Sequence, residues 1–208
     1  MDLFENNEYY YIVLEFMAGK DLYDYLSVSN FDLGEERVCT LTYQIAQGLQ
    51  YMHSYGIVHR DLKLENIMMT DQTKSSVPKL VDFGLSKMIG PSETATEPFG
   101  TLGYVAPEIL SKKPYGFSCD LYSMGCIVYA LLSGSLPFDN ESQEETIRMT
   151  KEDTVVFDSA CWSTYSKESK DLVFRLLIKR PEERITLDQV LAHPWFRKVR
   201  PKFLEHNT

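Results

Sequence analysis

The feature that most constrains this chain is a short polar segment that places several kinds of charged side chain on one loop. It reads His59-Arg60-Asp61-Leu62-Lys63-Leu64-Glu65-Asn66, and Asp82-Phe83-Gly84 begins sixteen residues after Asn66. Carboxylate and carboxamide oxygens beside an ammonium group suit a polyphosphate bound through magnesium. We expect Asp61 to accept a hydroxyl proton and Lys63 to neutralise charge on a transferring phosphoryl group. Asn66 and Asp82 are the expected metal ligands.

A third motif makes this pattern specific. Ala106-Pro107-Glu108 closes a loop that reads Gly100-Thr101-Leu102-Gly103-Tyr104-Val105. The first segment resembles the catalytic loop of eukaryotic protein kinases, H-R-D-L-x-x-x-N, and the second resembles their metal-binding Asp-Phe-Gly triplet. Any one motif alone would be weak, but the three stand in the family's order and spacing. A different nucleotide-binding helical domain would require all three to be coincidental.

The resemblance implies a mainly α fold (α+β overall), which is the large lobe of a kinase built as a helical bundle with short β-hairpins. Residues 1–16 would be the end of the small lobe, 17–21 the hinge, 22–196 the large lobe and 197–208 a solvated tail. The run from Tyr9 to Phe16 is rich in tyrosine and β-branched residues and predicts a strand.

Apolar spacing predicts the main helices of that lobe. One helix, ending near Gly56, is indicated by apolar residues at intervals of three and four, namely Val38, Leu41, Ile45, Leu49 and Met52. A second helix runs from Asp120 to Gly134 and is apolar on most sides, so it belongs in the middle of the domain. Thr186 and Gln189 fit a capping box for the last helix.

The resemblance also implies the cofactors ATP and Mg²⁺. The expected nucleotide contacts are Leu14, Glu15, Met17, Asp21, Met68 and Val81. Among them Leu14 would guard the pocket behind the adenine, the hinge backbone would bind the adenine, and Met68 would lie under the ring.

Other motif residues are expected to support the catalytic loop. Thr101 would hydrogen-bond near Asp61 and Lys63 and so position the acceptor hydroxyl. Asp120 would accept backbone hydrogen bonds that orient His59 and Arg60.

Three further residues complete this supporting set. Phe83 belongs to the metal-binding triplet. Glu108 would meet Arg184 as a buried ion pair of structural importance.

Glu97 carries an inference from spacing. It lies four residues before Thr101, where many kinases carry an activating phosphothreonine whose partner is the catalytic-loop arginine, here Arg60. We hypothesise that Glu97 pairs with Arg60 as a fixed negative charge that partly replaces phosphorylation. The alternatives are a solvated loop glutamate, or phosphorylation at Thr94 or Thr96.

The substrate class also follows from the resemblance. Lys63 marks kinases that phosphorylate serine or threonine, and the sequence is most similar to calcium/calmodulin-dependent and calcium-dependent kinases. Asp21 and Glu65 are acidic where that group contacts a substrate arginine. Ala130 stands where some relatives have a further acidic contact, so a single basic preference is expected in the protein substrates.

The chain departs from the family in one respect. No Gly-rich loop and no lysine-bearing strand precede Tyr9, so we expect a fragment, a truncated gene prediction or an engineered piece that lacks its small lobe. The missing lobe, or another upstream segment, is then a partner, and the chain alone would be inactive. The alternative function is a non-catalytic half-kinase that binds other proteins.

Charge and cysteine usage exclude other classes. A net charge of −9 and a pI near 5.0 disfavour non-specific nucleic-acid binding. The four cysteines lack C-x-x-C pairs, which indicates reduced thiols and not a zinc site. No apolar run is long enough to span a bilayer and no signal peptide is evident, so no membrane partner and a cytoplasmic or nuclear location are expected.

Overall fold

The computed structural model describes residues 2–28, 33–90, 92–158 and 160–199. The α-helices of this part are α1 (Leu22–Val28), α2 (Glu35–Ser54), α3 (Pro107–Leu110), α4 (Ser118–Ser133), α5 (Gln143–Glu152), α6 (Lys167–Leu176) and α7 (Leu187–Leu191). The 3₁₀ helices are η1 (Leu64–Asn66), η2 (Ala160–Thr164) and η3 (Pro194–Lys198). The mainly helical fold predicted from the sequence is confirmed.

The strands in the described residues are short and form three antiparallel pairs. They are β1 (Asp2–Glu5) with β2 (Tyr10–Val13), β3 (Ile57–Val58) with β6 (Lys87–Met88), and β4 (Ile67–Met69) with β5 (Pro78–Leu80). Strand β3 ends just before the 59–66 loop and β4 begins just after it, and each is paired with a later strand, β6 and β5 respectively. They therefore fix both ends of that loop.

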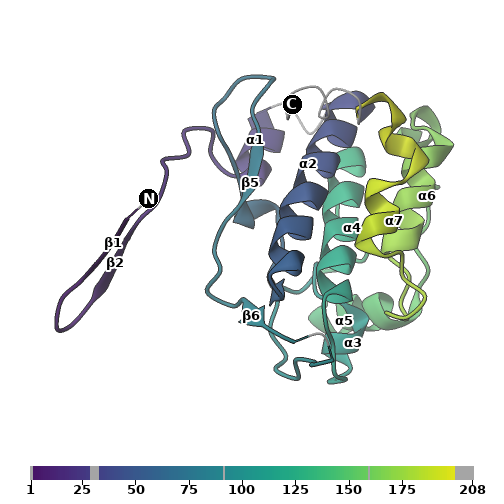
Figure 1. The fold of residues 1–208 in the computed structure, drawn as a ribbon. Helices are drawn as coiled ribbons and strands as arrows, with labels where there is room; N and C mark the ends of the chain where they lie inside the picture. Colours follow the sequence, from purple (N-terminus) through teal and green to yellow (C-terminus); the bar gives the residue numbers. More distant parts are fainter. Residues whose placement is uncertain (1, 29–32, 91, 159, 200–208) are drawn as a thin grey trace.

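Helices α2 and α4 stand side by side in the middle of the molecule, with α6 and α7 on one flank (Figure 1). The predicted apolar face of α2 is buried, comprising Val38, Leu41, Ile45, Leu49 and Met52. The helix ends at Ser54, and Gly56 follows with a φ of 72°, which a residue without a side chain adopts easily. The predicted end near Gly56 is confirmed.

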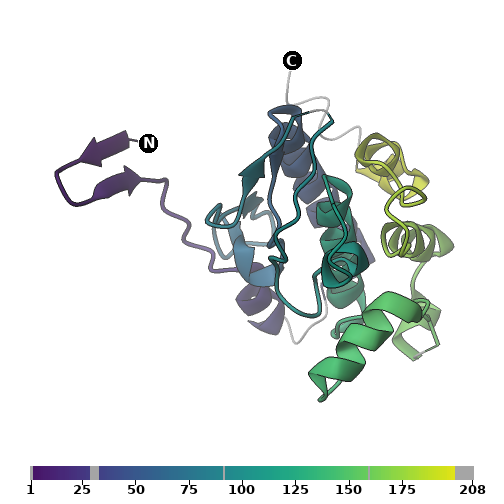
Figure 2. The same cartoon turned by 90° about the horizontal axis from the view of Figure 1, so that it is seen from below.

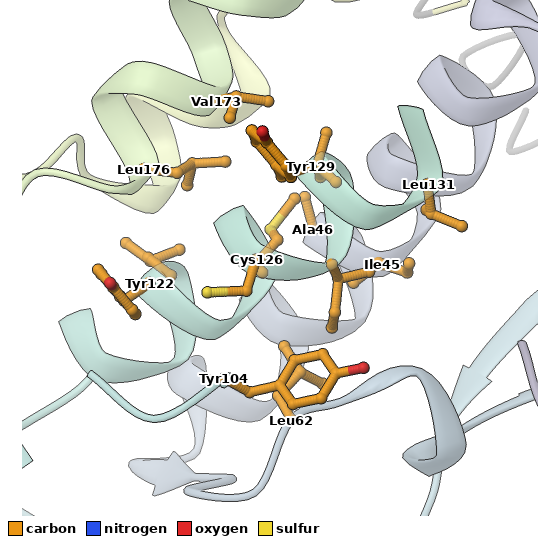
Figure 3. Packing of buried hydrophobic residues seen from close by; sticks show 14 of the residues in the cluster. Ile45, Ala46, Leu62, Tyr104, Tyr122, Cys126, Tyr129, Leu131, Val173 and Leu176 are labelled. Atoms are coloured by element: carbon orange, nitrogen blue, oxygen red, sulfur yellow. The ribbon is translucent and has the colours of Figure 1, made fainter. Parts of the chain in front are cut away.

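Helix α4 is the centre of the core. Every residue from Cys119 to Leu132 is buried, as the all-round apolar pattern predicts. Figure 3 shows Tyr122 and Cys126 of α4 packed among side chains of α2 and α6. Gly125 permits this packing, because a Cβ there would lie 2.8 Å from Cβ of Leu176.

The β1–β2 hairpin projects away from the helical body (Figures 1 and 2). The strand expected over Tyr9 to Phe16 is present but shorter, Tyr10–Val13, and its partner β1 was not predicted. Every residue of both strands is exposed. The hairpin therefore contributes nothing to the core of the helical body.

The C-terminal end of the lobe corrects one boundary. The capping box of Thr186 and Gln189 is present at the start of α7. Beyond it, Arg197 and Lys198 belong to η3 and Val199 is 1% exposed. The packed lobe thus extends to residue 199 and does not end at 196; residues 200–208 of the expected tail lie outside the described residues.

None of the helices in the described part of the chain combines the length and apolar character that crossing a membrane requires.

Candidate active site

The site is centred on the carboxylate of Asp61, which three side chains contact. The Thr101 hydroxyl donates to Oδ1 at 2.6 Å, and Lys63 Nζ lies 3.1 Å from Oδ2. Asn66 Nδ2 donates to the Asp61 backbone oxygen at 2.7 Å and to Oδ2 at 3.2 Å. Lys63 Nζ also donates to the Thr101 hydroxyl at 3.0 Å. Three residues of the 59–66 motif and one of the loop before Ala106 therefore meet at one point.

The electrostatic surroundings keep Asp61 ionised. Its partial burial would raise the pKa of the carboxyl, but the hydrogen bonds from Thr101 and Lys63 outweigh that effect and lower the pKa below its ordinary value. A carboxylate with a lowered pKa carries no proton at neutral pH. It is free to accept a hydrogen bond from an incoming hydroxyl group.

Asn66 and Asp82 fit the oxygen donors that Mg²⁺ takes. Because the Asn66 Nδ2 atom is engaged by Asp61, its carboxamide oxygen is the atom left for a cation. Asp82 is exposed and accepts only the backbone N–H of Gly84, at 3.2 Å, among the described residues. No three His, Cys, Asp or Glu side chains gather as a metal cage in this part of the chain. The arrangement suits Mg²⁺, which is commonly held by one or two protein ligands together with phosphates and water.

The backbone of the catalytic loop is held in a strained form. Arg60 has a φ of 70° and Asp82 a φ of 61°, values that residues with a side chain rarely adopt. Asp120 at the start of α4 accepts the N–H of His59 at 2.9 Å and that of Arg60 at 3.0 Å. The contact expected between Asp120 and this loop is thus present in the structure.

Two aromatic rings pack together where this loop meets Asp82-Phe83-Gly84. His59 is fully buried, and its Nε2 donates to the carbonyl of Val81 at 3.0 Å. Its ring packs against Phe83 with centroids 5.6 Å apart. His53, in the last turn of α2, lies 2.9 Å from Asp120 Oδ2 through Nε2. His53 is therefore a part of the site that sequence reasoning missed.

Glu97 forms the expected pair with Arg60, at 3.3 Å between Oε2 and Nη1. Lys87 of β6 contacts the other oxygen at 2.7 Å, a partner that was not predicted. The hydrogen bond from Lys87 is the main reason that the pKa of Glu97 falls to about 2. Glu97 is therefore a paired and partly exposed carboxylate in this structure.

Glu108 and Arg184 form a buried ion pair. Two parallel contacts of 2.8 and 3.0 Å join them, and both side chains are almost completely buried. Arg184 also donates to the carbonyl oxygens of Ser118, Ile178 and Lys179. The charged groups of both residues therefore have hydrogen-bond partners, as a buried ion pair requires.

The residues expected to contact the nucleotide lie in two places. Leu14 and Glu15 directly follow β2 of the hairpin, whereas Asp21 and Met68 belong to the helical body. Leu14 is 67% exposed, and Glu15 forms a 2.6 Å ion pair with Lys79 of β5. Asp21 forms an isolated backbone bridge with Met68. Its Oδ1 also accepts the N–H of Asp24 at 2.7 Å and so caps α1.

The other residues expected to contact the nucleotide are Met17, in the expected hinge, and Val81, in the lobe. Met17 and Val81 are half-buried, and the N–H of Val81 donates to the Asn66 backbone oxygen at 3.0 Å. Phe83 and Glu65 are exposed. Val81 and Phe83 flank Asp82 in the sequence, whereas Leu14 lies open to solvent beyond the last residue of β2.

Comparison with known proteins identifies the class. The family described as the protein kinase domain matches residues 1–196. The chain belongs to the protein kinase family. A Dictyostelium discoideum protein named a probable myosin light chain kinase is 39% identical over 196 residues, which make up 94% of this chain and 50% of that protein. The chain thus spans about half the length of that relative.

Proposed function

We propose that this chain is the large lobe of a serine/threonine protein kinase and carries the groups that transfer the γ-phosphoryl group of ATP to a hydroxyl. One observation carries the proposal: the Asp61 carboxylate lies within hydrogen-bonding distance of both Thr101 and Lys63. Bound ATP with Mg²⁺ would supply the phosphoryl group and neutralise part of its charge. Asn66 and Asp82 would hold the cation.

In this mechanism each residue has one task. Asp61 orients the acceptor hydroxyl and accepts its proton, and its lowered pKa keeps it ready at neutral pH. Lys63 places a positive charge beside the oxygen that joins the transferring group. Thr101 holds the side chains of Asp61 and Lys63 in position through its hydroxyl. Catalysis would then rest mainly on positioning and charge stabilisation.

An apolar groove supports a peptide substrate. It has a volume of about 320 Å³ and is lined by Pro98, Gly100, Leu102, Val105, Ile109, Leu110, Lys112 and Ile147. Two of these residues flank Thr101 directly in the sequence. A peptide whose hydroxyl lies at Asp61 would therefore place an adjacent apolar residue in the groove.

A basic residue elsewhere in the substrate is favoured by acidic side chains. Glu65 is exposed on η1, and Asp21 uses only Oδ1 for capping α1. Ala130 carries no charge where some relatives have a further acidic side chain, so we propose a preference for a single arginine in the substrate. A peptide library without arginine enrichment would exclude this preference.

Glu97 supplies a fixed charge in place of an activating phosphate. Its carboxylate neutralises the side chain of Arg60, which is 7% exposed and costly to leave unpaired. In the complete domain without phosphorylation, Glu97→Ala should lower activity and added acetate should restore part of it. Unchanged activity in that variant would contradict this role.

A second candidate is a non-catalytic module that binds other proteins. The observation favouring it is the exposed hairpin, whose apolar side chains include Phe4, Tyr10 and Ile12. In the catalytic proposal those side chains belong beside a small lobe. We propose that these 208 residues by themselves, without a Gly-rich loop over the phosphates, bind ATP weakly and transfer little phosphate.

The decisive experiment compares this chain with the chain extended upstream to a complete kinase domain. Magnesium-dependent ATP binding and phosphate transfer to serine peptides are measured in both. Asp61→Asn should abolish transfer in the extended protein and leave ATP binding nearly intact. Asp139→Asn, which removes an exposed carboxylate, serves as the control. ATP binding without transfer by the unmodified extended protein would favour the non-catalytic module.

A further inference from the structure

Tyr115 is buried beneath the loop that carries Glu97. It lies between α3 and α4 and is 3% exposed. Its backbone forms a two-way bridge with Ala95, with hydrogen bonds of 2.8 Å from Ala95 N–H to the Tyr115 carbonyl and 2.9 Å in the other direction. Ala95 is itself fully buried, whereas Thr94 and Thr96 on either side are exposed. The loop is therefore fastened at one point next to Glu97.

The hydroxyl of Tyr115 makes a second attachment. It donates to the backbone carbonyl of Glu97 at 2.6 Å and accepts from Arg60 Nη1 at 3.4 Å. The same Nη1 atom contacts the Glu97 carboxylate at 3.3 Å. The three residues thus form a closed ring of hydrogen bonds. Burial raises the pKa of the Tyr115 hydroxyl, so it retains the proton that it donates.

The segment that follows Tyr115 holds Arg60 from its other end. Asp120, five residues further along, accepts the backbone N–H of Arg60 at 3.0 Å. Arg60 is therefore fixed at its side chain by Tyr115 and Glu97 and at its backbone by Asp120. Asp61 is the next residue in the chain. A displacement of Tyr115 is transmitted to the candidate base through one peptide unit.

We propose that Tyr115 is a positioning residue whose hydroxyl fixes Glu97 against Arg60 and thereby sets the orientation of Asp61. This role deepens the proposed kinase function and rests on it for its catalytic consequence. Its structural part, the fastening of residues 95–99, does not depend on catalysis. The two parts can therefore be tested separately.

The first test measures amide hydrogen exchange in the 208-residue chain. Tyr115→Phe removes only the hydroxyl, so exchange at Ala95 and Phe99 should accelerate about five- to tenfold, the ratio expected for one lost hydrogen bond. Phe99 is informative because its N–H donates to the same Glu97 carbonyl at 2.9 Å. Tyr129→Phe is the matched control, since it removes a hydroxyl that donates to the Val156 carbonyl at 3.4 Å. Unchanged exchange in Tyr115→Phe would overturn the inference.

The second test measures kinetics in the complete kinase domain. Tyr115→Phe should lower kcat about five- to tenfold and leave the KM for ATP unchanged. Combining it with Glu97→Ala should cost less than the product of the two separate effects, because both changes break the same ring. Independent, multiplicative effects would refute the catalytic part. An inactive wild-type domain would instead contradict the proposed function, and the exchange experiment would still decide the role of Tyr115.

Discussion

The hydroxyl of Thr101 donates a 2.6 Å hydrogen bond to Oδ1 of Asp61, joining residues that are forty positions apart in the chain. The same hydroxyl accepts from Lys63 Nζ at 3.0 Å. One small side chain thus fixes the distance between the candidate base and the candidate phosphate-binding cation.

Removing that hydroxyl should impair the chemical step. In a complete kinase domain, Thr101→Ala is expected to lower kcat roughly 10- to 100-fold with little change in the KM for ATP, because small misplacements of reacting groups are costly. Thr101→Ser keeps the hydroxyl and should retain most of the activity. Steady-state kinetics measures both variants. Equal kcat values in Thr101→Ala and the unmodified enzyme would contradict this role.

Breaking the buried ion pair should destabilise the lobe. Glu108→Gln leaves the charge of Arg184 buried without its partner, at a cost of about 3–5 kcal/mol in the free energy of unfolding. The melting temperature should fall by roughly 10 °C. Chemical and thermal denaturation measure these changes. Glu182→Gln, in the exposed pair with Arg180, is the control and should leave the melting temperature unchanged.

The titration of Glu97 should depend on Lys87. In the native protein the pKa of Glu97 is about 2, below its ordinary value of 4.5. The carboxylate therefore stabilises the folded state fully above pH 4.5, and this contribution is lost as the pH falls toward 2. Lys87→Met should raise the pKa toward the ordinary value, as measured by NMR of the carboxyl carbon. An ordinary pKa in the unmodified protein would show that the contacts with Lys87 and Arg60 do not persist in solution.

A methyl group at position 125 should be poorly tolerated. Gly125→Ala would place a Cβ 2.8 Å from Cβ of Leu176, so α4 and α6 must separate. We expect a loss of about 1–3 kcal/mol in stability, although alanine is usually the better helix former. Gly116→Ala is the comparison, because its Cβ would meet only Ile89 at 3.8 Å. Equal melting temperatures for the two variants would contradict this account.

Local patterns predicted the large elements well. The spacing of apolar residues such as Ile45 and Leu49 predicts α2, and the apolar run around Cys126 predicts the buried helix α4. These patterns predict helices because the buried face of a helix takes an apolar residue every three or four positions. The strand β1 was missed because Leu3 and Phe4 alone give too short a pattern.

Only those residues of the site that belong to the family's motifs could be predicted from the sequence. Thr101 was expected near Asp61 and Lys63, and hydrogen bonds join the three; Asn66, expected as a metal ligand beside Asp82, also contacts Asp61. Tyr115 and His53 were missed because their partners are distant in sequence, whereas Lys87 lies only ten positions from Glu97 but no pattern between the two predicts their contact. Tyr115 contacts a residue 55 positions away and His53 one 67 positions away. No local pattern encodes such contacts, since they arise only when the loop, β6 and α4 pack together.

The left-handed backbone at Arg60 and Asp82 has a consequence for engineering this protein. Glycine would relax both positions, yet it would delete the guanidinium and the carboxylate for which the strain is maintained. Lys20 and Lys112 have the same backbone form on the exposed surface, although Lys112 also lines the apolar groove. A selection for heat resistance alone would therefore accept glycine at Lys20 and reject it at Arg60, whose buried side chain hydrogen-bonds Glu97, Tyr115 and the Leu85 carbonyl. Only a selection that also demands turnover would exclude glycine at Asp82.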